Sequence, residues 1–97
     1  MERALHAELW TSFAAQLRSY AAAHGLNSRH HVVVEVSSNE ILIRVNTRWL
    51  RFTPVEMSAE NHRSQPFHLN EDGTVTIGAV TEEMDFTAER LTRELMQ

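Results

Sequence analysis

Cysteine and lysine are absent from this sequence, and glycine and proline are scarce. The lack of cysteine excludes disulfides, thiolate zinc sites and cysteine nucleophiles. The three glycines, at positions 25, 73 and 78, are too scattered to form a phosphate-cradling loop. No apolar run approaches the roughly 18 residues of a transmembrane helix, and the N-terminal "MERALHAELW" lacks the apolar core of a signal peptide. We therefore expect a cytoplasmic protein with no membrane partner.

The basic residues are unusual because all nine are arginine, which together with abundant alanine is typical of a GC-rich bacterial genome. The net charge is −4, and the sequence contains no basic block. Since nucleic-acid binding needs a concentrated positive face to neutralise phosphates, we expect no nucleic-acid partner. A chain of 97 residues is near the common size of one core, so residues 1–97 are expected to form a single domain.

An amphipathic helix is predicted near the N-terminus. Its apolar residues recur at helical spacing: Leu5, Leu9, Phe13, Leu17 and Tyr20. Trp10 and Ala21 flank this stripe, and polar side chains occupy the opposite side. Gly25 is free to adopt the left-handed conformation that closes a helix, so the helix is expected to end there.

The valine run that follows switches to a period of two, which indicates a β-strand. Val32, Val34 and Val36 share one face, while His31, Val33 and Glu35 share the other. Two-residue turns at Ser38-Asn39 and Asn46-Thr47 connect this strand to two more. In this register Ile41 lies between Val36 and Phe52, and the other apolar residues fall on the same face. A one-residue slip would scramble that face, so we predict a three-stranded antiparallel meander.

The middle of the chain is harder to interpret. Pro54 is expected to end the third strand. Residues 55–65 are long for a connection, so they are predicted to form a mobile functional loop or, alternatively, a short helical turn. A further hairpin pairs Phe67–Leu69 with Val75–Ile77 across a turn that places Gly73 in the left-handed position.

Two signals mark the boundaries of the later elements. Pro66 cannot donate to a strand ladder, so its strand is expected to start at an edge or outside the sheet. A C-terminal helix has one apolar face, formed by Met84, Ala88, Leu91 and Leu95. Thr81 is a good cap for this helix, but a start there turns Phe86 away from the core. A start at Thr87 lets Phe86 pack on Leu91 as a hydrophobic staple, and we favour this later start.

This order of elements predicts a two-layer α+β domain. An antiparallel meander of about five strands carries the N-terminal and the C-terminal helix on one face, in the order α-β-β-β-β-β-α.

Neither metal binding nor catalysis has a clear signature. His30 and His31 are adjacent in a strand and point to opposite faces, so they cannot chelate one ion together. A site would need His62 or Glu60 from the 55–65 loop, or His24 from the first helix, and no ligand spacing typical of zinc is present. We therefore expect no metal and no cofactor. No nucleophile–base pattern is found either, so we favour a protein without enzymatic activity.

The outer face of the meander is the strongest candidate site. The predicted registers align Val33, Arg44 and Trp49 in one row and Glu35, Leu42 and Arg51 in the next. Tryptophan and arginine are enriched at interface hot spots, and apolar side chains on an outer face are typical of contact surfaces. The alternative is that the arginine stems simply lie over the tryptophan ring.

Two families share this element order. A helix, an antiparallel meander and a closing helix resemble the frataxin layout, whose iron-handling role depends on an acidic ridge along the first helix and first strand. Here those segments contain only Glu2, Glu8 and Glu35. The order and size also look like those of acidic, dimeric type III secretion chaperones, with "FHLNEDGTVTI" in the place of a late hairpin. The middle helix that those chaperones use to dimerise is not evident.

The expected function is that of a non-enzymatic protein–protein interaction or accessory module. It would bind a protein partner or itself, as a homodimer, through the outer face around Trp49. The alternative is a protein that handles a metal or small ligand with its histidines and the 55–65 loop.

Overall fold

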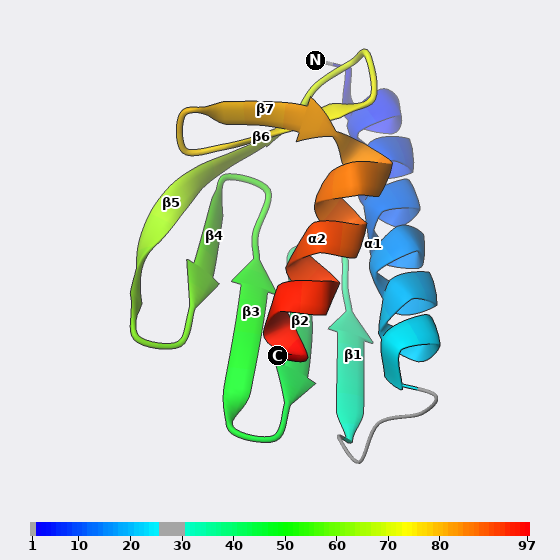
Figure 1. Cartoon of the computed structure of the whole chain (residues 1–97). Coiled ribbons are helices and arrows are strands. Elements are labelled where there is room, and N and C mark those ends of the chain that lie inside the picture. The colour runs from blue at the N-terminus through cyan, green and yellow to red at the C-terminus, as the bar shows by residue number, and fades with distance from the viewer. Residues whose placement is uncertain (1, 26–30) are drawn as a thin grey trace.

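Two helices flank seven strands in the structure, a computed structural model that describes residues 2–25 and 31–97 (Figure 1). The helices are α1 (Arg3–Gly25) and α2 (Met84–Leu95). The strands are β1 (Val32–Val36), β2 (Ile41–Val45), β3 (Arg48–Phe52), β4 (Glu56–Ala59), β5 (His62–Leu69), β6 (Thr74–Ile77) and β7 (Val80–Glu83). Each strand pairs antiparallel with the next along the chain, in the order β1 to β7. The predicted α+β meander between two helices is confirmed, but it has seven strands rather than about five.

Helix α1 ends at Gly25 as predicted, and its buried face is slightly rotated from the predicted stripe. The fully buried side chains are Trp10, Phe13, Ala14, Leu17 and Ala21. Leu9 and Tyr20, which we placed in the stripe, are only half-buried. The rotation brings the Trp10 indole to the sheet, where its Nε1–H donates to the Ser37 carbonyl at 2.8 Å.

The three-stranded meander has the predicted registers. Val36 lies opposite Ile41, and Ile41 lies opposite Phe52. The second turn begins at Asn46, whose φ of 57° is in the left-handed region that asparagine tolerates better than most residues. Ile41 and Phe52 are fully buried, so the face that the alternation selects is the core face.

Residues 55–65, which we predicted to be a mobile loop or a helical turn, instead form most of the β4–β5 hairpin. Ala59 pairs with His62 across a two-residue turn, in which Asn61 has a φ of 60°. Pro66 itself lies inside β5 and pairs with Glu56, but the start of this strand, residues 62–65, is paired on one side only, as an edge position predicts. Proline is tolerated here because it lies just beyond the last residue pair of the β5–β6 ladder, where its carbonyl accepts from the Gly78 N–H at 2.9 Å and no donor is needed to continue the ladder.

The last hairpin explains why both predicted starts of the C-terminal helix were wrong. Phe67 and Leu69 pair with Ile77 and Val75 as predicted, and Gly73 has a φ of 87°. The chain then turns back at Gly78 (φ 62°), where an added Cβ would lie 2.8 Å from Gln65 Oε1. Residues 80–83, including Thr81, are therefore strand β7, and α2 begins directly after it at Met84.

Both helices lie on one face of the sheet (Figure 1). A trio of phenylalanines joins the layers: Phe13 from α1, Phe52 from β3 and Phe67 from β5, with ring centroids 5.2 to 5.6 Å apart. Helix α2 contacts β3, β6 and β7, and it also packs along α1. In Figure 1 the β4–β5 hairpin stands to the side of both helices, which leaves part of the inner sheet face uncovered.

Candidate functional site

The outer face of β1–β3 carries the two rows that the sequence predicts. Val33 lies opposite Arg44, which lies opposite Trp49. In the next row Leu42 lies between Glu35 and Arg51. The apolar members Val33, Leu42 and Trp49 are half-buried, and Arg44 is exposed. The five predicted contact residues therefore form one continuous patch on the face opposite the helices.

The charges of this patch have both signs. Arg51 Nε donates to Glu40 Oε2 at 2.6 Å, and both side chains remain about two-fifths exposed. An ion pair this exposed contributes at most about 1 kcal/mol to stability. No aromatic ring among residues 2–25 and 31–97 packs against Trp49. The most exposed large apolar side chains, Val55, Val80 and Phe86, lie outside this patch.

A second candidate site lies on the inner face, where sequence reasoning predicted only a loop. It is a groove of about 630 Å³ between α2 and the β4–β5 hairpin. Two rows of the inner face run into it: Leu50, Ala59 and His62 in one, and Phe52, Met57 and Gln65 in the other. Its apolar lining also includes Ile77 of β6 and, on α2, Leu91 and Leu95. The groove exists because α2 packs on β3, β6 and β7, whereas the β4–β5 hairpin stands to the side of it (Figure 1).

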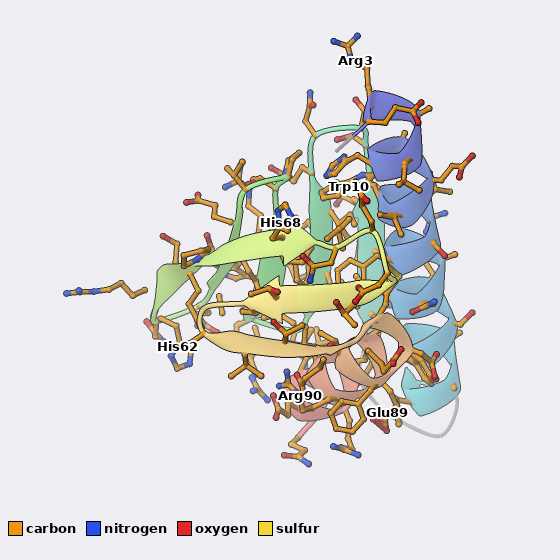
Figure 2. All side chains as sticks on the ribbon, turned by 90° about the horizontal axis from the view of Figure 1, so that it is seen from above. Arg3, Trp10, His62, His68, Glu89 and Arg90 are labelled. Atoms are coloured by element: carbon orange, nitrogen blue, oxygen red, sulfur yellow. The ribbon has the colours of Figure 1, made fainter. Side chains whose placement is uncertain are left out.

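The charged side chains on the two walls of the groove differ in whether they form ion pairs. On the helix side, Arg90 contacts Glu82 at 2.7 Å and Glu94 at 3.5 Å. On the hairpin side, His62 and Arg63 are exposed, and none of the ion pairs in the described residues includes them. Figure 2 labels His62 and Arg90, which belong to the opposite walls.

The histidines do not converge. His31 precedes β1, while His62 opens β5, so three strands lie between them. His30 lies outside the described residues, and the predicted opposition of His30 and His31 is therefore not tested. His24 Nε2 is buried and has no hydrogen-bond partner among the described residues, and it lies 3.8 Å from Glu89 Oε1. Within residues 2–25 and 31–97, no three His, Asp or Glu side chains are grouped as metal ligands.

A polar contact between the helices shifts a pKa. The Tyr20 hydroxyl donates to Asp85 Oδ1 at 2.8 Å. This hydrogen bond, with smaller effects from burial and from the Asp85 charge, raises the pKa of Tyr20 above its ordinary value of 10.0. The contact links α1 to the first turn of α2, next to the contact between His24 and Glu89.

No protein-family model, no curated protein and no solved structure matches this chain. The resemblance to the frataxin and chaperone layouts therefore rests on element order alone. In the described part of the chain, no helix combines the length and hydrophobicity that crossing a membrane requires.

One signal could have revealed the hairpin that forms the groove. Val55, Met57 and Ala59 alternate with polar residues just before Asn61, a residue suited to a left-handed turn position. The small alanine and the later proline weaken this pattern.

Proposed function

We propose that this protein is a non-enzymatic binding module that joins a protein partner, or a second copy of itself, through the outer face around Trp49. One observation carries the proposal: Trp49, Arg44 and Arg51 lie in adjacent rows with Val33 and Leu42, on a face that neither helix covers. Partly exposed tryptophan and arginine side chains supply much of the binding energy at interfaces.

A homodimer formed by opposing these faces is the simplest version, because two-fold self-association is the commonest oligomer. The same face carries Glu35 and Glu40 beside Arg44 and Arg51. A two-fold axis can therefore bring opposite charges together, which favours a specific pairing of two identical faces.

The test compares Trp49→Ala and Arg51→Glu with the wild type by sedimentation velocity and by pull-down. Both variants are expected to weaken association at least about tenfold while leaving the circular dichroism spectrum unchanged. Arg18→Glu, an equal charge change on the exposed side of α1, is the control and should associate normally. A wild type that stays monomeric at high concentration and recovers no partner would contradict the proposal.

Metal or small-ligand handling is the second candidate, and the observation that favours it is the presence of His62 in the groove lining. Titration with zinc, nickel and iron, followed by histidine NMR shifts, separates the two candidates. Saturable shifts confined to His62 and its groove neighbours would favour ligand handling over the outer-face module.

A further inference from the structure

Strand β5 has a free edge along its first half. On one side, β4 pairs with β5 from His62 to Pro66. On the other side, β6 pairs only with Phe67–Leu69, and the bond from the Gly78 N–H to Pro66 is the last on that side. In the part of the chain that the structure describes, no strand lies beside the second edge of residues 62–65. Such an edge presents unpaired backbone groups, which an extended chain can satisfy by adding a strand.

The groove adjoins this edge and supplies an apolar floor. His62 and Gln65 of the free segment both line it, together with Met57, Leu91 and Leu95. Its volume of about 630 Å³ is within the roughly 300–1,000 Å³ range of sites that enclose ligands. An added strand can therefore gain backbone hydrogen bonds at the edge and bury alternate side chains on the floor.

The charged residues of the groove favour some peptide sequences over others. Arg90 is satisfied by Glu82 and Glu94, so the helix wall offers no free cation. On the hairpin wall, Arg63 has no acidic partner among residues 2–25 and 31–97, and Glu60 at the turn is the opposing charge nearest to it in the chain. A register shift in the β4–β5 ladder and the arginine on the strand both discourage pairing with an arbitrary strand. An acidic side chain that neutralises Arg63 removes part of this barrier.

We propose that the groove between α2 and the β4–β5 hairpin binds an extended peptide segment of a partner protein. The segment pairs with the free edge of β5 at residues 62–65, places alternate apolar side chains on the floor, and sets an acidic side chain against Arg63. Trp49 also lines the groove, but Val33, Leu42 and Arg44 of the outer face do not, so either proposal can fail without the other.

The experiment selects binders from a random-peptide phage library with the full chain as bait. Enriched peptides are expected to alternate apolar residues with others and to contain Asp or Glu near the pattern. On titration of the enriched peptide, the amide signals of residues 62–65 should shift in NMR spectra, and those whose N–H faces the free edge should exchange more slowly with solvent. The peptide itself should give the shifts of an extended strand.

Two variants test the two parts of the site. Ala59→Trp fills the groove from the inner face of β4 and is expected to abolish binding. Arg63→Glu is expected to weaken binding about fivefold to tenfold through charge reversal, whereas the matched control Arg18→Glu keeps full affinity. Thermal melts of all three establish that a loss of binding is not a loss of fold.

Four outcomes overturn the proposal. These are a library without enriched sequences, a bound peptide that is helical, shifts that map to the outer face around Val33 and Leu42, and binding that survives both groove variants. A parallel titration with decanoate tests whether the groove binds a small apolar ligand instead of a peptide. If decanoate shifts the groove signals and no peptide does, the groove is a small-ligand site and the peptide proposal is wrong.

Discussion

Tyr20 is the single tyrosine of the chain, which makes its titration directly observable. Its hydroxyl donates to Asp85 across the interface between α1 and α2, and this bond is the main cause of its raised pKa. Because the pKa is raised in the folded state, the contact stabilises the fold below the ordinary tyrosine pKa. That contribution is lost as the pH rises through the raised value.

We predict that Asp85→Asn lowers the pKa of Tyr20 toward 10.0, since it removes the negative charge and weakens the acceptor. The near-ultraviolet absorbance of tyrosinate during an alkaline titration measures the change. Asp72→Asn is the control, because Asp72 bonds Thr74 in the β5–β6 turn and should leave the Tyr20 titration unchanged. Equal midpoints in the wild type and Asp85→Asn would show that this contact does not form in solution.

At the scale of elements, the start of α2 is decided by its neighbours. The Met84 N–H donates to the Gly73 carbonyl at 3.1 Å, and the Thr87 hydroxyl donates to the Glu83 carbonyl at 3.0 Å. Met84 is therefore held in the core, while Phe86, two residues later, is 52% exposed. The predicted staple between Phe86 and Leu91 is wrong for this reason.

The difference in burial between Met84 and Phe86 is testable by urea denaturation. Met84→Ala is expected to lower the free energy of unfolding by about 2–5 kcal/mol, because it empties a buried site. Phe86→Ala should change the free energy of unfolding by no more than about 0.5 kcal/mol, because the side chain is on the surface and about half exposed. A large loss for Phe86→Ala would mean that the helix starts later and that the ring is packed.

The β4–β5 hairpin depends on its turn. Asn61 has a φ of 60°, a region that costs most side chains about 1–2 kcal/mol and costs glycine little. We predict that Asn61→Ala destabilises the protein by about 1 kcal/mol, whereas Asn61→Gly is close to neutral. Chemical denaturation of the two variants and the wild type measures the difference in the free energy of unfolding. The same cost for both substitutions would indicate that residues 55–65 do not form the turn, as the mobile-loop hypothesis requires.

At the scale of the whole molecule, one core connects the two layers. The rings of Phe13, Phe52 and Phe67 contact one another, and they come from α1, β3 and β5. The fluorescence of Trp10 reports on the helix side of the sheet, and that of Trp49 reports on the outer face. No element of the described chain has a separate core of its own.

We predict a single cooperative unfolding transition, because small domains with one core usually unfold in a two-state manner. Tryptophan fluorescence and far-ultraviolet circular dichroism should give the same urea midpoint. Trp49→Phe isolates the Trp10 signal and should reproduce that midpoint by both methods, apart from any shift in stability that the substitution causes. Separate midpoints would mean that the β4–β7 part unfolds independently of α1 and the first three strands.

The sequence by itself determined the elements whose signals are local. The helical spacing from Leu9 to Ala21 and the closing Gly25 specified α1. The strict alternation from Val32 to Phe52 specified three strands and their registers, because a slip of one residue would place the whole apolar set in water. It also determined the rows of the outer face.

Only the tertiary structure decided β4, β7, the start of α2 and the groove. Strand β4 is short and β5 contains Pro66, so their pairing depends on neighbours on both sides rather than on local preference. Residues 80–83 have a good helix-start signal in Thr81, but pairing with β6 outweighs it. The groove belongs to no segment of the sequence, because it is the space left where α2 packs on β3, β6 and β7 and the β4–β5 hairpin stands to one side.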